Sequence, residues 1–306
     1  MLTSTTFGQY LTPGQAKIFY DEFKAVKAQY EELFRTIKSK RATESIWHVG
    51  GFGLWSVNTE GAAITTEDIK QAAGAVIAPK RYDKGYTISW ELMQDDPYGV
   101  FNGTAGKNGS AKTLGSSLRA TVETAAAAVL SNGFTANGYD NKPLFSSTHK
   151  YNVNTGTPPT GSNVLEADLT DEGLKEACKM MRAQKDNSGI APCGAIPDKL
   201  IVHPDSEFTA RMILNSGVNF NGTVYEKNSL PNLKIVVMDY LADDTAWFVK
   251  ARDIDNLLFI WREEPIFNSH GIEKSMDWFF YGYARFAANY GDWRGLVGVQ
   301  VPEPQS

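Results

Sequence analysis

The sequence predicts an α+β fold, and three observations support this prediction. Two long amphipathic helices are expected in the first half of the chain, and a glycine-punctuated extended segment separates them. The last part of the chain alternates aromatic and other residues as a β-strand does. The chain has 306 residues, 42% hydrophobic and 21% charged, which is typical of a globular protein and excludes a disordered one.

The charge balance excludes one class of function. Lys and Arg number 30 and Asp and Glu number 35, which gives a formal net charge of −5. A protein that grips nucleic acid mainly through its phosphates carries a basic excess, and this chain does not. No apolar run approaches the ~20 residues of a membrane-spanning helix. Two cysteines are too few for a disulfide framework.

The first predicted helix covers residues 12–38. Thr12 would cap it, Pro13 suits the first helical position, and Gln15 completes a capping box. Apolar residues then recur at spacings of three and four, at Phe19, Phe23, Val26, Tyr30, Leu33 and Ile37. This face either packs on its own domain or docks on a neighbouring chain, and the residues alone leave both readings open.

Residues 44–92 are predicted as an extended excursion with little apolar mass. Strands are expected at Ala75–Arg81 and Tyr86–Trp90, joined by a turn at Asp83–Gly85, and a short helix at Thr66–Ala72. Such a hairpin has no core of its own, so we expect it to pack against another structural element.

Two further helices follow. Ala111–Asn132 is predicted as a rod ~30 Å long, whose run Ala125–Ala128 allows another element to approach closely. Thr170 opens the next helix, and its apolar face carries Cys178, which we therefore expect in the core rather than as a reactive thiol.

The remainder alternates between strands and one helix. Strands are expected at 200–203, 234–239, 246–250 and 256–261, with a helix at 206–215. From Met276 to Val299 the chain is mostly β. One face of that strand carries Trp278, Phe280, Gly282, Ala284, Phe286, Ala288 and Tyr290, and the other carries Phe279, Tyr281, Tyr283 and Arg285. Because both rows are aromatic, we expect both to be covered.

One motif comes close to a catalytic loop. Residues 106–113 match the phosphate loop G-x-x-x-x-G-K-T except that Ala111 replaces the glycine before Lys112 and Thr113. No strand leads into it, so a flexible entry to the helix is the favoured reading. The four histidines lack metal-ligand spacing, and His149 could serve a nearby Ser or Cys only if a hydrolase motif were present, which it is not. The sequence thus predicts no enzyme, no cofactor and no metal.

Three motifs in order point to a known family. They are Asp140-x-Lys142-Pro143-Leu144-Phe145-x-x-x-His149, then Leu200-Ile-Val-His-Pro-x-x-x-Phe208-x-Ala210, and a terminal Asp292-Trp293-Arg294-Gly295. Together with the arm, the hairpin and the long alanine-rich helix, this succession resembles the major capsid proteins of tailed bacteriophages with the Hong Kong 97-type fold. The nearest branch is similar to the Mu-type major head subunits.

The resemblance implies a division of the chain. Residues 1–45 correspond to an N-terminal arm, and 46–88 to an extended loop that reaches over a neighbouring subunit. Residues 89–195 and 262–306 correspond to a peripheral domain with the long helix as its spine, and 196–261 to an axial domain.

The resemblance also implies a function and partners. The chain would assemble into hexamers and pentamers of an icosahedral shell around double-stranded DNA, held without sequence specificity. A separate scaffold, a portal and decoration proteins would be partners, with no membrane, and the virion capsid would be assembled in the host cytoplasm. The alternatives are an encapsulin-like compartment, an adhesion protein built on the aromatic strands and, from another class, a nucleotide-binding enzyme using residues 106–113.

Aromatic residues and lysines supply the candidate contacts between subunits. Aromatic side chains are favoured both in cores and in interfaces. Some members of the family crosslink a lysine of the extended loop to a neighbour, but no motif here carries that chemistry over. The candidates are Phe19, Phe23, Tyr30, Trp55, Lys70, Lys80, Trp278, Tyr281 and Tyr283.

Overall fold

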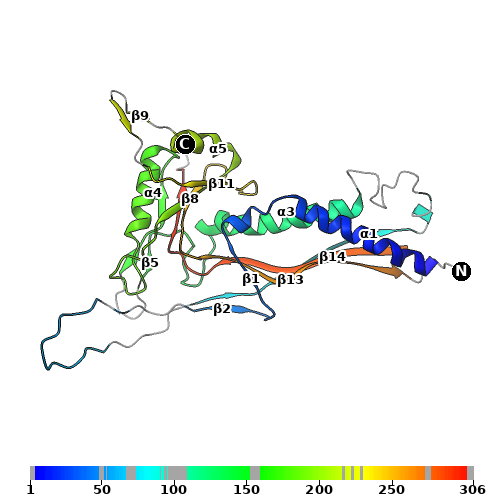
Figure 1. The fold of residues 1–306 in the computed structure, drawn as a ribbon, viewed down its shortest axis with the longest axis horizontal. Coiled ribbons are helices and arrows are strands. Elements are labelled where there is room, and N and C mark those ends of the chain that lie inside the picture. Colours follow the sequence, from blue (N-terminus) through cyan, green and yellow to red (C-terminus); the bar gives the residue numbers. More distant parts are fainter. Residues whose placement is uncertain are drawn as a thin grey trace.

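A long sheet lined by two helices forms one part of the molecule, and a smaller sheet stands across one end of it (Figure 1). This computed structural model describes residues 4–47, 52, 54–66, 74–89, 91–92, 95, 109–151, 159–215, 218–221, 224–227, 230–272 and 277–301. Side chains are described from residue 13 onward, except at 218–221 and 224–227. A loop projects from the junction of the two parts, away from the far end of the long sheet (Figure 1).

The long sheet is built on a pair of very long antiparallel strands. These are β13 (Leu257–Ile272) and β14 (Asp277–Tyr290). β4 (Lys80–Ile88) pairs antiparallel with β14, and β1 (Arg35–Lys38) pairs parallel with β13, so the strand order is β1-β13-β14-β4.

The predicted alternation along β14 is confirmed. Every second residue from Trp278 to Phe286 is buried, and the residues between them are only half-buried. β13 extends eleven residues beyond the predicted end at Trp261. Its bulges at Trp261–Ile266 accommodate Pro265, which cannot donate a ladder hydrogen bond.

Two helices cover the row of buried side chains on this sheet, which we call the inner row. They are α1 (Ser4–Ala25) and α3 (Ser110–Ser131), and Figure 1 shows both on the same side of the strands. α3 agrees with the predicted rod. The two helices approach closely at Gly115, where a Cβ atom would lie 2.6 Å from the carbonyl oxygen of Phe19. The Phe19 ring in turn packs on Phe267, with ring centroids 5.2 Å apart.

The predicted helix over residues 12–38 is wrong in both its bounds. α1 begins earlier, so Pro13 lies inside it, and the helix ends at Ala25. A 3₁₀ turn, η1 (Tyr30–Glu32), and then β1 replace its second half. Tyr30 and Leu33 still face the core, which is why their spacing imitated a helix. Residues 35–38 are drawn instead into parallel pairing with β13.

The predicted turn at Asp83–Gly85 is also wrong. β4 runs straight through these residues, and Gly85 pairs with Tyr281. A Cβ atom at position 85 would lie 2.6 Å from the Phe279 ring, so the glycine allows a close approach rather than a turn. The predicted helix at 66–72 lies outside the described residues except for its first residue.

The smaller sheet has the order β11-β8-β12-β15-β7. Its strands are β7 (Val164–Glu166), β8 (Pro197–Val202), β11 (Lys234–Val237), β12 (Trp247–Ala251) and β15 (Leu296–Gln300). α4 (Asp171–Ala183) and α5 (Glu207–Asn215) pack on it. Thr170 caps α4 as predicted, since its hydroxyl accepts from the Gly173 amide at 3.1 Å. Cys178 is buried, as expected, and burial raises the pKa of its thiol to about 11.

The remaining elements are short. They are β2 (Glu44–Ile46), β3 (Ala75–Ile77), β5 (His149–Lys150), β6 (Thr160–Gly161), β9 (Val218–Asn221), β10 (Val224–Lys227), η2 (Asn132–Phe134) and η3 (Pro204–Ser206). β2 pairs with β3, β5 with β6 and β9 with β10. Within the described ranges, no helix is long and apolar enough to cross a membrane.

Replacing Gly115 by alanine tests the close helix contact. Glycine to alanine in a helix interior normally stabilises by about 1 kcal/mol. Here the new methyl group would meet the Phe19 backbone, so we expect the sign to reverse, with a loss of about 1–3 kcal/mol in the free energy of unfolding measured in urea. Ser116→Ala, one residue along the same helix, is the control and should be close to neutral. A stabilised Gly115→Ala chain would contradict the contact.

Lys250 in β12 predicts a pH dependence. Its side chain is buried and donates to the carbonyl oxygens of Ala251 and Ile254, and burial lowers its pKa to about 8. A lysine whose folded pKa lies below the unfolded value penalises folding when charged. Stability should therefore rise from about pH 8 to about pH 10, by at most ~1.4 kcal/mol per pH unit. Lys250→Met should remove this rise in urea unfolding curves, and a variant with an unchanged pH profile would refute the assignment.

Candidate functional site

The loop at residues 52–66 exposes a series of large apolar side chains. Trp55 is 97% exposed and Leu54 75%, and neither belongs to one of the chain's hydrophobic clusters. The other exposed apolar side chains of this segment are Phe52, Val57 and Ile64, and Trp47, which precedes it in the sequence, is also exposed. Apolar surface concentrated in this way marks a contact surface rather than ordinary solvent-facing residues.

Local hydrogen bonds shape the tip of this loop. The Ala62 amide donates to the Thr59 carbonyl at 3.1 Å, and Asn58 Nδ2 donates to the Ala63 carbonyl at 3.1 Å. Gly61 has a φ of +82°, which the turn requires. The described residues 54–66 form no strand, so the loop is an extended excursion that turns back at residues 59–62.

The root of the loop lies on the open side of the long sheet. β2 and β3 pair with each other, and Ile77 packs with Leu258 and Ile260, the β13 residues that point away from α1 and α3. Among the described residues, no helix lies on this side of the sheet.

Beyond that root, an aromatic row remains uncovered. Phe279, Tyr281 and Tyr283 are half-buried along β14, with the first two rings stacked at 5.5 Å between centroids. The guanidinium of Arg81 lies 5.6 Å from the centre of the Tyr283 ring. The expectation that both rows are covered thus holds within the chain only for the inner row. The loop and this row therefore present apolar surface on the same side of the molecule.

The predicted contact residues fall into two groups. Phe19 (0% exposed), Phe23, Tyr30 and Trp278 lie in the chain's own core, which leaves them almost no surface for a neighbour. Trp55 and Lys80 are exposed, and Tyr281 and Tyr283 are half-buried. Lys70 lies outside the described residues. A contact between subunits through any of these residues stays a prediction.

A buried clamp that the sequence did not reveal fixes the exit from α1. The two oxygens of the Glu123 carboxylate in α3 accept from the amides of Gln29 and Tyr30, at 3.2 and 3.1 Å. Arg119, one turn earlier, donates from Nε to the Phe23 carbonyl at 2.9 Å and stacks on that ring. Burial raises the pKa of Glu123. On a sequence, this i,i+4 pair resembles an ordinary surface ion pair.

The same segment also binds the smaller sheet. Gln29 Nε2 donates to Asp239 Oδ2 at 2.6 Å, and Lys234 Nζ contacts the Glu32 carboxylate at 2.7 Å. Lys27 pairs with the same carboxylate, and these lysines lower the pKa of Glu32 to about 2. Residues 27–34 are therefore held to both parts of the molecule.

The residues that nearly match a phosphate loop make contacts that stabilise the fold. Lys112 pairs with Glu22 of α1, with Nζ and Oε2 3.5 Å apart, and Thr113 Oγ1 donates to the Gly109 carbonyl at 3.2 Å. Ala111 is fully buried beside Phe19. Residues 106–108 lie outside the description. Among the residues that are described, no His, Cys, Asp and Glu side chains gather as a metal site.

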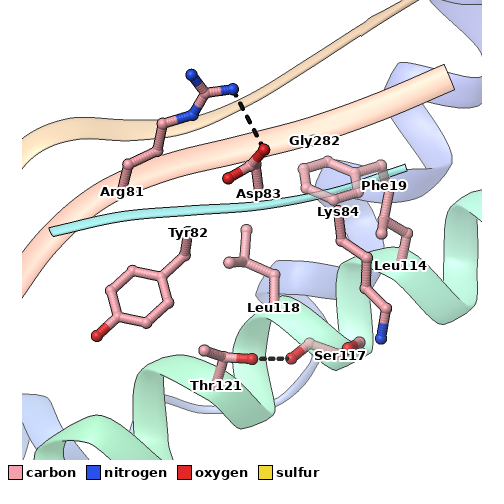
Figure 2. Close-up of a pocket in the computed structure, with 10 residues that line it drawn as sticks. All are labelled: Phe19, Arg81, Tyr82, Asp83, Lys84, Leu114, Ser117, Leu118, Thr121 and Gly282. Atoms are coloured by element: carbon pink, nitrogen blue, oxygen red, sulfur yellow. Dashed lines mark hydrogen bonds and ion pairs between the residues drawn. The ribbon is translucent and has the colours of Figure 1, made fainter.

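One hollow borders the long sheet beside α3. It encloses about 300 Å³ between β4 and the helix, and Figure 2 shows Lys84, Ser117 and Leu118 among its lining residues. Thr121 Oγ1 donates within the helix to the Ser117 carbonyl at 2.8 Å, so this hydroxyl is already engaged. The lining is half polar and carries no arrangement of catalytic groups.

Solved structures share this architecture. The procapsid protein of bacteriophage JBD30 matches 98% of this chain and 76% of its own, with a TM-score of 0.54 at 16% identity. A structure described as Microbacterium phage Oxtober96 gives a TM-score of 0.58 at 10% identity, covering 90% of this chain and 92% of its own. A virus-like particle from Pyrococcus furiosus gives 0.53 at 12% identity, covering 94% and 97%. No curated protein sequence matches the chain.

The fold is therefore the Hong Kong 97-type capsid fold, an α+β subunit with an arm, an extended loop and a long helix on a long sheet. The sequence family described as phage capsid protein matches residues 73–299. The chain belongs to this phage capsid protein family. It is a structural shell protein of the capsid and not an enzyme.

Removing the Glu123 carboxylate tests the clamp. In Glu123→Ala, two buried amides lose their acceptors and Arg119 loses its counter-charge, so we expect about 2–4 kcal/mol lower stability in urea unfolding. Glu123→Gln keeps one acceptor oxygen and should lose clearly less. Equal stability of the alanine variant and the natural chain would show that the clamp contributes nothing.

Proposed function

We propose that this chain is the repeating subunit of an icosahedral phage head, and that the loop at 52–66 of each copy covers the aromatic row Phe279, Tyr281 and Tyr283 of a neighbour. The observation that carries this proposal is the almost complete exposure of Trp55 on a loop without a core. Lys80, Tyr281 and Tyr283 belong to the same contact in this proposal.

The geometry favours contacts that repeat around a ring. The loop and the aromatic row are different surfaces, so a contact between them joins unlike faces of two copies and continues from subunit to subunit. Heterologous contacts close into rings when the rotation between successive copies divides a full turn evenly, and hexamers and pentamers are rings of this kind. Burying one large apolar side chain stabilises by ~1.5–3 kcal/mol, and repetition over a closed shell adds these small gains.

The proposed contents and partners follow from charge and family. A chain with a net charge of −5 would not bind DNA tightly through its phosphates, which suits non-specific enclosure of double-stranded DNA that must later leave. A scaffold, a portal and decoration proteins complete the proposed set of partners. Assembly would take place in the host cytoplasm. Purified particles should contain DNA, whereas particles holding a cargo protein and no nucleic acid would indicate an encapsulin-like compartment.

Trp55→Ala tests the proposed contact. The variant should fold like the natural chain because Trp55 belongs to no hydrophobic cluster of the described residues. It should, however, form shells only at a subunit concentration about tenfold higher or more. Size exclusion and negative-stain microscopy, with scaffold supplied, provide the measurement. Ser56→Ala, on the neighbouring exposed residue, is the matched control and should assemble normally. Normal assembly of Trp55→Ala would contradict the contact, and a natural chain that stays monomeric under every condition would contradict the proposed function itself.

A further inference from the structure

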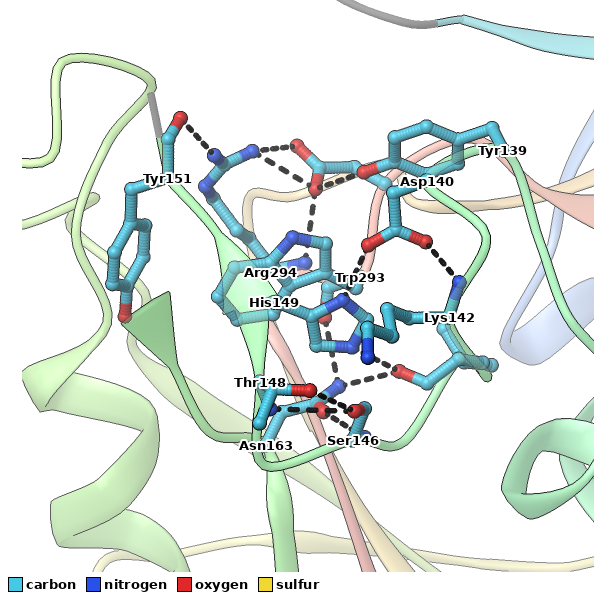
Figure 3. A network of polar contacts seen from close by, with 12 residues as sticks. Tyr139, Asp140, Lys142, Ser146, Thr148, His149, Tyr151, Asn163, Trp293 and Arg294 are labelled. Atoms are coloured by element: carbon cyan, nitrogen blue, oxygen red, sulfur yellow. Dashed lines mark hydrogen bonds and ion pairs between the residues drawn. The ribbon is translucent and has the colours of Figure 1, made fainter. Parts of the chain in front are cut away.

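The junction between the two sheets contains a buried polar network centred on His149 (Figure 3). β14 passes into β15 through residues 291–295, and β12 passes into β13 through 252–256. These two connections are hydrogen-bonded to each other, since the Gly291 amide donates to the Asn256 carbonyl at 2.7 Å and Asn256 Nδ2 donates to the Arg294 carbonyl at 2.8 Å. His149 lies against this junction, with its ring stacked on Trp293.

Both ring nitrogens of His149 face hydrogen-bond acceptors. Nδ1 lies 2.7 Å from Asp140 Oδ2, and Nε2 lies 3.1 Å from the Leu144 carbonyl oxygen. The side chain is 1% exposed, so bulk water does not reach it. A carbonyl oxygen and an ionised carboxylate can only accept, whereas a neutral imidazole has one donor and one acceptor nitrogen. In a neutral ring, the unprotonated nitrogen would therefore point its lone pair at a lone pair of the oxygen that faces it.

A neighbouring amide prevents a simple rearrangement. Asn163 Nδ2 donates to the same Leu144 oxygen at 2.8 Å, and Asn163 Oδ1 accepts from the Ser146 amide at 2.9 Å. These two bonds fix the orientation of the Asn163 side-chain amide, with Nδ2 toward Leu144 and Oδ1 toward Ser146. The Leu144 carbonyl thus already accepts from Asn163, and at 3.1 Å it is placed to accept a second hydrogen bond from a protonated Nε2 of His149.

The surroundings suit a cation. The Trp293 ring lies parallel to His149, with centroids 4.4 Å apart and an angle of 7°, so its π-face can stabilise positive charge. Asp140 also accepts from the Lys142 amide at its other oxygen, which keeps the carboxylate oriented. The nearby charge of Arg294 is balanced by Asp292, at 2.9 Å from Nη1. The other titratable groups of the surrounding segments are Tyr139, Lys142, Lys150, Tyr151, Lys185 and Tyr290.

We propose that His149 is held as an imidazolium and that its charge pair with Asp140 is a pH-sensitive latch on the junction between the two sheets. With both protons present, the ring joins the 139–151 segment to Trp293 and so to residues 291–295. Loss of one proton at higher pH removes one of these two hydrogen bonds and sets two lone pairs face to face. The latch is therefore closed while the ring carries both protons and loosens when one of them is lost.

The charge state can be measured on the natural chain without any variant. Nitrogen-15 spectra of histidine-labelled protein at about pH 7 should show both nitrogens of one ring protonated, and Trp293→Leu should identify that signal as the stacked ring by shifting it. A neutral ring, with either nitrogen unprotonated, would overturn the proposal.

The Asp140→Asn variant distinguishes a contact that depends on the charge of His149 from ordinary packing. The asparagine amide can donate to Nδ1 of a neutral ring, so this variant should keep the contact without needing charge. Hydrogen exchange at residues 291–295, corrected for its intrinsic pH dependence, should lose about tenfold protection in the natural chain when the pH is raised until the ring loses a proton. Asp140→Asn should show no such loss. Equal pH dependence in the two chains would overturn the latch, and neither result depends on whether the chain assembles.

Discussion

The pairing of β13 with β14 is the constraint on which the rest of this molecule depends. Because side chains alternate along a strand, this long ribbon necessarily has two rows, and only one row is covered by α1 and α3. The inner row makes a core of stacked rings, such as Phe259 and Phe286 at 5.4 Å between centroids. The outer row ends in Phe279, Tyr281 and Tyr283, with no helix of the described chain over them. The chain thus has a hydrophobic core of its own and still presents apolar surface on its other side.

The sequence predicted elements whose signals are local. Thr170 marks the start of α4, the run from Ser110 to Ser131 contains no helix breaker other than Gly115, and the period of two along β14 separates its rows. The Hong Kong 97-type fold was expected from a resemblance to a known family, which the order of such elements and three short motifs carry. The family match and the shared architecture of the solved capsids confirm it.

Errors arose where partners distant in the sequence decide the structure. Ile37 has helical spacing to Leu33, yet β13, more than 200 residues later, pairs with it as a strand. Gly85 resembles a turn residue in the sequence. Its real role depends on the distant Phe279, whose ring occupies the space that a side chain at position 85 would fill. Glu123 resembles a surface residue because the amides that it binds, at 29 and 30, lie in the segment that follows another helix, far away in the sequence. The exposure of Trp55 is likewise invisible in a sequence, since nothing local distinguishes an uncovered tryptophan from a buried one.

We propose that copies of this chain bury the uncovered row and the exposed loop in each other. Hydrogen exchange, compared between free subunits and assembled shells, tests this contact because it reports on each segment separately. We expect the amides of residues 54–66 and 279–283 to become strongly protected together on assembly, while those of the inner core at residues 257–261 change little. Unchanged exchange in both segments, in particles shown by microscopy to be closed, would contradict it.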